Sequence, residues 1–479
     1  MRLVYQNAMK VLVWLGKNEE GHASMAVNAI LEITLKCCNR AGISISKLYT
    51  YDEFRSLVVD DSWTQLDCNN PTTWNSVLWF YSRSWFSRLW VMQEVNAGNE
   101  VILICGDVEV GWDIVGLAAR YITSNRELFD AYDFWKSNMW CAETLRLRFF
   151  HQWNCLDFLH QTRDFRTSDP RDKIYALLGM PSFLNWDRTI YADYEKETQE
   201  VLRGFADMYL DRANLDPLSY LQHDHDIPCG IASWIPQWTH QPQRNQVLIR
   251  LIRIRNPEQT ASKGFLASIV RNPSNDILKV SGIRFDVVTD CVSIDNEELF
   301  NSRQRTKENH PVLDFWRNQN AYPTMYPTGE DSLTVYSIVL AGGLHCDFHR
   351  ARERPSPFKA NFSAYLAWLL KIEGQQVPKS LHKAAETGDW TQWEWLPRDT
   401  CWNRVLFNTL NGYMGLGPKV SKPGDVVCVL GGGMVPILLR PANGYFQVVG
   451  ESYVHGIMEG EAVQLWKDKK LKDEEFQIR

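Results

Sequence analysis

Glu94 is the residue whose position most suggests chemistry, because it ends an unusually aromatic stretch. Seven aromatic side chains lie before it, at positions 74, 79, 80, 81, 85, 86 and 90. Ser84 can cap a helix here, and helical spacing would place Trp90 and Glu94 on one stripe of it. A carboxylate near a strand end and beside aromatic rings is partly desolvated, which is typical of acid–base groups. The alternative is a structural carboxylate held by Arg83 or Arg88.

A second candidate is the sequence at residues 168–179, Ser-Asp-Pro-Arg-Asp-Lys-Ile-Tyr-Ala-Leu-Leu-Gly. Arg171 and Asp172 at a helix start could bind an anion. Helix capping offers a plainer account, because Asp169 suits the N-cap, Asp172 the first turn and Gly179 the C-terminal stop. We therefore predict a structural helix over residues 169–179.

The remaining motifs are weaker indications of a site. Gly431-Gly432-Gly433 joins two apolar segments and has no following Lys-Ser/Thr, so it predicts a hairpin turn and not a phosphate loop. His345-Cys346-Asp347-x-His349 and His223-Asp224-His225-Asp226 have donor atoms at metal-like spacing, but no second ligand cluster is marked. No Walker loop, G-x-S-x-G or G-x-G-x-x-G occurs. We therefore expect no metal and no cofactor.

Composition limits the partners and the compartment. The net charge of −6 argues against general nucleic-acid binding. The eleven cysteines form no C-x-x-C pair, which favours reduced, buried thiols. No apolar run reaches the ~18 residues of a membrane helix, and no secretory signal is evident at the N-terminus. We expect a cytoplasmic protein that binds neither membrane nor nucleic acid.

The elements that would position Glu94 follow an α/β pattern. Residues 11–15 and 101–105 are short apolar runs that read as strands of a parallel sheet, covered by helices on both faces. Helices between them complete a strand–helix–strand alternation. A first strand of this kind needs neighbours on both edges.

The rest of the chain divides into a helical, an irregular and a strand-rich region. Residues 112–220 read as mainly helical, including a helix at 194–210, whereas 241–400 is irregular, with loops near 256–276 and 301–330. Short strands at 426–430, 435–439 and 445–449 indicate an antiparallel meander or small barrel, and the charged tail is expected to fray. The predicted regions are 1–125 (α/β), 126–240 (helical), 241–400 (variable, mixed), 401–466 (C-terminal β domain) and 467–479 (charged tail).

Several blocks together resemble the fungal heterokaryon-incompatibility (HET) family. They are Tyr5-x-x-Ala8-x-x-Val11-Leu12-Val13-Trp14-Leu15-Gly16, Trp85-Phe86-Ser87-Arg88-Leu89-Trp90-Val91-x-Gln93-Glu94, Cys105-Gly106, residues 169–179, Ser233-Trp234-Ile235-Pro236-x-Trp238, Gly415-Leu416-Gly417-Pro418, Gly424-Asp425-Val426-Val427-Cys428 and Gly450-Glu451-x-Tyr453-Val454-His455-Gly456. The blocks occur in family order and touch about half of the chain.

The resemblance implies a partial, TIR-like HET domain at the N-terminus. Family members usually open with a Ser-Tyr-x-Trp-Gly-type strand and a Trp-Ile-Asp-Ala-x-Cys-Ile-Asn-Gln-type strand, and both are absent here. We expect Met1 to be the true start, so that the domain is shortened. By similarity to NAD-cleaving TIR domains, Glu94 would be the catalytic carboxylate, with Trp85, Trp90 and Arg88 as binding residues.

Three functions are compatible with this resemblance. The first is self/non-self recognition through an unknown protein partner. The second is a cofactor-independent enzyme of secondary metabolism, which would cyclise an apolar terpenoid or polyketide substrate, even by Diels–Alder-type cycloaddition; the 20 tryptophans suit such a cavity. The third is an NAD-cleaving enzyme that uses Glu94.

Overall fold

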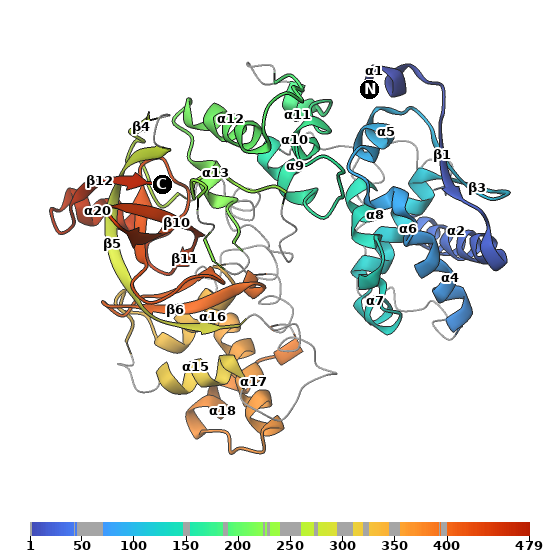
Figure 1. The fold of residues 1–479 in the computed structure, drawn as a ribbon. Helices are drawn as coiled ribbons and strands as arrows, with labels where there is room; N and C mark the ends of the chain where they lie inside the picture. The colour runs from blue at the N-terminus through green and yellow to red at the C-terminus, as the bar shows by residue number, and fades with distance from the viewer. Residues whose placement is uncertain are drawn as a thin grey trace. The chain divides into compact units, whose positions relative to one another are not determined.

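The chain forms two compact units, which are described separately (Figure 1). The computed structural model describes residues 2–42, 44–45, 70–146, 154–184, 190–223, 226–227, 230–239, 260–272, 276–294, 310–319, 325–343, 355–391, 393 and 400–479. The first unit is Met1–Val201 with Trp238–Gln241, and the second is Leu202–Gln237 with Pro242–Arg479. The division falls within helix α12 (Thr198–Leu210).

The first unit contains a small three-stranded sheet. Strands β1 (Val11–Gly16) and β2 (Val101–Cys105) are parallel, and β3 (Val108–Gly111) returns antiparallel to β2. Both predicted strands and their parallel pairing are therefore confirmed. Helices α2 (His22–Ala41) and α6 (Trp112–Ser124) pack on each other and against β3.

The expectation that helices cover both faces of β1 is wrong for the described residues. Val11, Val13 and Leu15 are buried, whereas Leu12 and Trp14 are 64% and 60% exposed. Strand alternation explains the difference, because successive side chains point to opposite faces and the packed helices bury only one of them.

The predicted single helix from Ser84 to Glu94 is also wrong, because it is broken in the middle. A 3₁₀ turn, η4 (Ser84–Ser87), is followed by extended backbone at Arg88 (φ −82°, ψ 130°) and then by α5 (Val91–Ala97). At the break, Leu89 N–H donates to the Arg166 carbonyl and Arg166 N–H donates to the Ser87 carbonyl. A neighbouring segment thus satisfies backbone groups that a continuous helix would have used.

Shorter helices make up the rest of the first unit. They are α1 (Arg2–Asn7), η1 (Glu19–Gly21), α4 (Pro71–Tyr81), α7 (Arg126–Ala131), η5 (Phe134–Lys136), α8 (Met139–Arg146), α9 (Cys155–Gln161), α10 (Asp172–Tyr175) and α11 (Pro181–Leu184). Capping residues mark where two of these helices begin. The Asn70 side chain accepts a hydrogen bond from Thr73 N–H at the start of α4, and Pro71 is the first helical residue. Asn154 and Asp157 form a capping box at the start of α9.

The second unit combines helices with a curved, mostly antiparallel sheet. Besides α12, its helices are α13 (Asp216–Ser219), α15 (Pro311–Gln319), α16 (Ser332–Leu340), α17 (Pro355–Ile372), α18 (Lys379–Ala385) and α20 (Glu461–Lys467). Its strands are β4 (Ile269–Asn272), β5 (Ile277–Ser293), β6 (Arg404–Thr409), β7 (Met414–Pro418), β8 (Val426–Leu430), β9 (Ile437–Ala442), β10 (Tyr445–Glu451), β11 (Tyr453–Val454) and β12 (Asp473–Ile478). The predicted C-terminal antiparallel strands are confirmed.

The long strand β5 organises this sheet. Its first part pairs with β12, its middle with β8 and its last part with β6. The pairings run β5–β12–β10–β9–β8 and return to β5, while β6, β7 and β11 extend to one side. The pairing between β10 and β12 is the weakest in this circuit of strands, because it consists of one residue pair, Phe446 with Ile478.

The expectation that the charged tail frays is wrong. Residues 473–478 form β12, which pairs with residues 278–283 of β5. Phe476 and Ile478 are fully buried, and this burial holds the end of the chain in the sheet.

Candidate functional site

Glu94 lies on α5, half-buried, with its carboxylate held by an indole. Trp85 Nε1 donates a hydrogen bond to Glu94 Oε2 at 2.9 Å. Trp85 is itself buried against Phe86 and Trp112, with ring centroids 5.3 and 5.8 Å away. Because the aromatic core fixes Trp85, its N–H also fixes the orientation of the Glu94 carboxylate.

The two arginines proposed as alternative partners of Glu94 are placed differently. The Arg83 guanidinium lies over the Trp79 ring, 3.9 Å from its centroid. Arg88 is exposed at the break between η4 and α5. Neither arginine forms an ion pair with Glu94 among the described residues.

Tyr5 is a neighbour of Glu94 that sequence reasoning missed. Burial raises the pKa of Tyr5, the nearby Glu94 carboxylate raises it further, and Arg88 opposes them. Contact between α1 and α5 brings this phenol to the same place. Tyr5 stands 89 residues before Glu94 in the sequence, and local spacing gives no signal for such a pair. The cluster of Tyr5, Trp85, Arg88 and Glu94 offers a carboxylate, a phenol and a cation, which could bind and protonate or deprotonate a polar ligand.

Trp90, also proposed as a binding residue, contacts the second sequence motif. Trp90 Nε1 donates to Asp172 Oδ2 at 3.0 Å, and the Tyr194 hydroxyl donates to Asp172 Oδ1 at 2.6 Å. Asp172 is 8% exposed. Asp172 therefore joins α5, α10 and the segment before α12, a role beyond the helix-dipole partner that we predicted.

The helix predicted over residues 169–179 is shorter in the structure. Helix α10 spans only Asp172–Tyr175, and turns follow it. Asp169 accepts the Arg171 N–H at 2.9 Å and pairs with the Arg171 guanidinium, which lowers the pKa of Asp169. Gly179 is not the C-terminal cap. It packs on Gln93, where a β-carbon would lie 3.2 Å from the side-chain amide.

Lys173 ties the same motif to the broken helix. This buried ammonium donates to the carbonyls of Arg163 and Phe165. Phe165 directly precedes Arg166, the residue that pairs with Arg88 at the break. Burial lowers the pKa of Lys173 to about 8. Together with the Gln93 amide, which donates to the Ala176 carbonyl at 2.8 Å, these contacts make residues 169–179 the support of the segment that carries Glu94.

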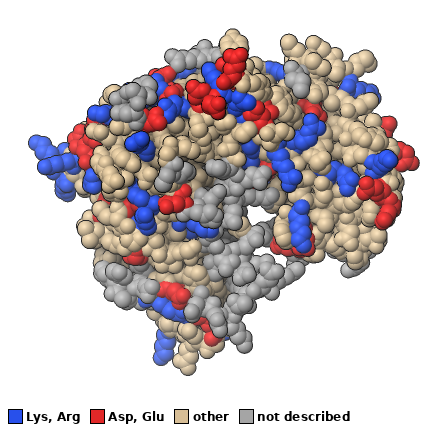
Figure 2. Space-filling model, in the orientation of Figure 1, with Lys and Arg blue, Asp and Glu red and all other residues tan. Residues whose placement is uncertain are grey.

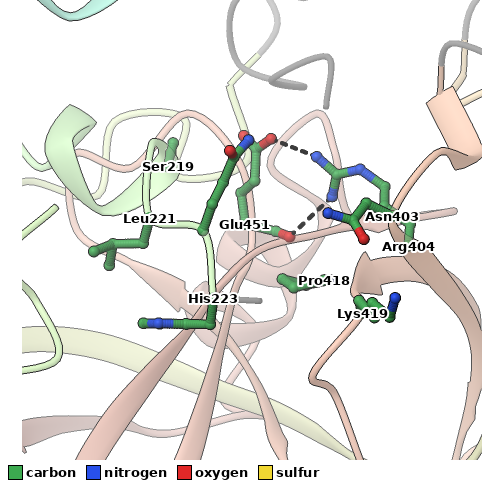
Figure 3. Close-up of a pocket in the computed structure, with 9 residues that line it drawn as sticks. Ser219, Leu221, His223, Asn403, Arg404, Pro418, Lys419 and Glu451 are labelled. Carbon is green, nitrogen blue, oxygen red and sulfur yellow. Dashed lines mark hydrogen bonds and ion pairs between the residues drawn. The ribbon is translucent and has the colours of Figure 1, made fainter. Parts of the chain in front are cut away.

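A pocket in the second unit is lined by polar and charged groups (Figure 3). Its residues are Ser219, Leu221, Gln222, His223, Asn403, Arg404, Pro418, Lys419 and Glu451. Arg404 and Glu451 point toward each other and form an ion pair of 2.7 Å, and both side chains are less than 5% exposed. A ring nitrogen of His223, Nε2, lies 3.0 Å from the Val448 carbonyl. The ion pair joins β6 to β10, which indicates a structural role.

The metal-like motifs give no site in the part of the chain that the structure describes. No group of three or more His, Cys, Asp or Glu side chains that could hold a metal occurs there. His345, Cys346, Asp347 and His349 lie outside the described residues, as do Asp224 and His225 of the other motif. The three glycines at 431–433 form the turn between β8 and β9, as predicted. Among the described helices, none is long and apolar enough to cross a bilayer.

Comparison with known proteins adds two findings. Residues 378–473 match the model of the Het-6 beta-barrel domain, a range that includes β6 to β11 and α20. The heterokaryon incompatibility protein 6, OR allele, of Neurospora crassa is 22% identical in an alignment that covers 96% of this chain and 78% of that protein. No solved structure matches the chain.

Proposed function

We propose that the chain is a member of the heterokaryon-incompatibility (HET) family and acts in self/non-self recognition when fungal cells fuse. The observation that carries the proposal is the likeness to heterokaryon incompatibility protein 6, which extends over 96% of the chain and therefore over both units. The match of residues 378–473 to the Het-6 beta-barrel domain supports the proposal for this part of the second unit. A likeness confined to one unit would support a shared fold only.

Forced heterokaryons test this proposal. One of two compatible fungal strains expresses the chain, and its partners are drawn from a panel of natural isolates. We expect growth arrest or death with some isolates and normal growth with others, because recognition depends on a difference between partners. A frame-shifted copy of the same coding sequence is the control. Normal growth with every isolate, or equal toxicity with all of them and in unfused cells, would contradict the proposal.

NAD cleavage is the second candidate activity, and the geometry of Glu94 favours it over cyclisation. The Trp85 indole orients a half-buried carboxylate in an α/β unit, with Tyr5 and Arg88 nearby. The cyclisation hypothesis requires an apolar cavity, and the pocket in Figure 3, which contains the Arg404–Glu451 ion pair, does not provide one. A TIR-like fold and catalysis by Glu94 both remain part of this proposal.

An NAD assay separates the two functions. If recognition is the function, the purified chain should leave NAD intact over hours at micromolar protein. If Glu94 is catalytic, NAD disappears, and Glu94→Gln lowers the rate by roughly 10²–10⁴-fold, as expected when an acid–base group is lost. Glu100→Gln is the matched control, since Glu100 is a glutamate of the same unit in a surface pair with Lys10. Equal loss in both variants would exclude a specific role for Glu94.

A further inference from the structure

Contrary to the expectation that the chain binds no membrane, we propose that the turn after α20 is a docking site for an anionic lipid surface. Four exposed lysines lie here: Lys467 ends α20, and Lys469, Lys470 and Lys472 follow in the turn. Figure 2 shows Lys and Arg side chains standing out from the margin of the second unit where Figure 1 draws α20. We call these four residues the lysine turn.

The positive charge of the lysine turn is only partly offset, because Asp468 and Asp473 lie beside its lysines while Glu474 and Glu475 pair with other residues. Within the described residues, none of its four ammonium groups forms an ion pair. Glu474 pairs with Arg284 at 2.6 Å, and Glu475 pairs with Lys279 at 3.0 Å. Asp473 accepts a hydrogen bond from Trp466. Residues 467–473 carry a formal charge of +2 in a chain whose net charge is −6.

Lys469 occupies a left-handed backbone position at the end of α20, where glycine is the usual residue. Lys469 N–H bonds to the Trp466 carbonyl and Lys470 N–H to the Leu465 carbonyl, which is the Schellman pattern that ends a helix. The residue at this position adopts a left-handed conformation, and Lys469 has φ = 60°. Glycine is the usual residue there because a β-carbon is unfavourable in this region. A strained residue of this kind is often retained for function.

An apolar side chain accompanies the charges. Phe265 packs on Trp466 with ring centroids 5.0 Å apart, and the next residue, Leu266, is 82% exposed. Lysines beside an exposed aliphatic side chain suit a bilayer, which offers negative headgroups above hydrocarbon. Nucleic acid is favoured less, because the turn has no arginine fork and no free aromatic face for stacking.

Vesicle sedimentation with the full chain tests the site. We expect binding to phosphatidylcholine vesicles that contain phosphatidylserine, weaker binding to pure phosphatidylcholine, and loss of binding as salt rises. Each lysine near such a surface contributes about fivefold in partition coefficient. Replacing all four by Gln should therefore lower partitioning by more than about a hundredfold. Leu266→Ser should reduce the binding that survives at high salt.

Two further variants make the result specific. Lys371, Lys379, Lys383 and Lys422 are exposed lysines of the same unit, and replacing these four by Gln should change partitioning little. Lys469→Gly should weaken binding about fivefold while raising the melting temperature by about 2 °C, because glycine relieves the left-handed strain. Equal binding to both vesicle types, or equal loss in the control variant, would overturn the proposal. So would binding of a DNA duplex, without vesicle binding, that depends on the lysine turn.

Discussion

Replacing Arg404 with Met should lower the free energy of unfolding of the second unit by about 3–5 kcal/mol, the usual cost of leaving one partner of a buried ion pair uncompensated. Arg404 and Glu451 are 3% and 3% exposed, so bulk water would solvate the remaining Glu451 carboxylate poorly. The pair also joins β6 to β10, strands that are not neighbours in the sheet order. Urea unfolding followed by circular dichroism measures the change.

Two controls separate the burial of this pair from its charge. The Arg284–Glu474 pair in the same unit is 43% and 38% exposed, and Arg284→Met should cost less than about 1 kcal/mol. The double variant Arg404→Met with Glu451→Leu should recover much of the stability, since an apolar pair of similar volume suits a dry site. If Arg404→Met costs no more than Arg284→Met, the pair is hydrated and the account of Figure 3 fails.

The parts of the fold that the sequence predicts well are those in which local pattern and tertiary burial agree. Strands β8 to β10 are apolar runs separated by glycine turns, and most of their apolar side chains are buried. In such segments the apolar residues both favour a strand and form its buried face, so the hydrophobic pattern alone predicts the strand and its burial. Strand β1 agrees only in part, because its apolar run predicts the strand but not the exposure of Leu12 and Trp14.

Strand β5 shows why other parts are missed. Its 17 residues include Gly282, Asp286 and Asp290, which resemble a loop. In the structure, Asp286 accepts hydrogen bonds from the Asn411 backbone and side chain. The pairing shifts register beside Asp286 and beside Asp290, where the strand bends. Gly282 leaves room for Phe476 of β12, whose ring would lie 2.9 Å from a β-carbon. These partners come from distant segments, and no local pattern reveals them.

At the candidate site, the sequence predicts which residues matter but not how they contact one another. The sequence singles out Trp85, Trp90 and Glu94, but their contacts depend on the break at Arg88. In one continuous helix Trp85 and Glu94, nine residues apart, would point to opposite sides. The break lets the Trp85 indole reach Glu94, while Trp90 turns to Asp172. Since Arg166 stabilises that break from 78 residues away, helical periodicity could not predict it.

Asp172→Ala should destabilise the first unit by about 2–4 kcal/mol, because it removes a charged acceptor that serves two donors. The Trp90 indole would lose its partner in a site where Asp172 is 8% exposed, whereas Tyr194 is 49% exposed and its hydroxyl can donate to water instead, so most of the cost comes from Trp90. Asp172→Asn should cost about half as much. Its oxygen can still accept from Trp90, and its amide can donate to the Tyr194 oxygen, which accepts as well as donates.

A double-mutant cycle attributes the loss to these bonds. Trp90→Phe and Tyr194→Phe each remove one donor, so each should cost less in the Asp172→Ala background than in the wild type. Asp169→Ala, three residues away, is the control. Asp169 caps Arg171 N–H near the surface, and its loss should cost about 1 kcal/mol. Equal costs for Asp169→Ala and Asp172→Ala, or strict additivity in the cycle, would mean that Asp172 does not join α5 to α10. Residues 169–179 would then stabilise their own turn alone, and the orientation of Glu94 would depend on the aromatic packing of Trp85.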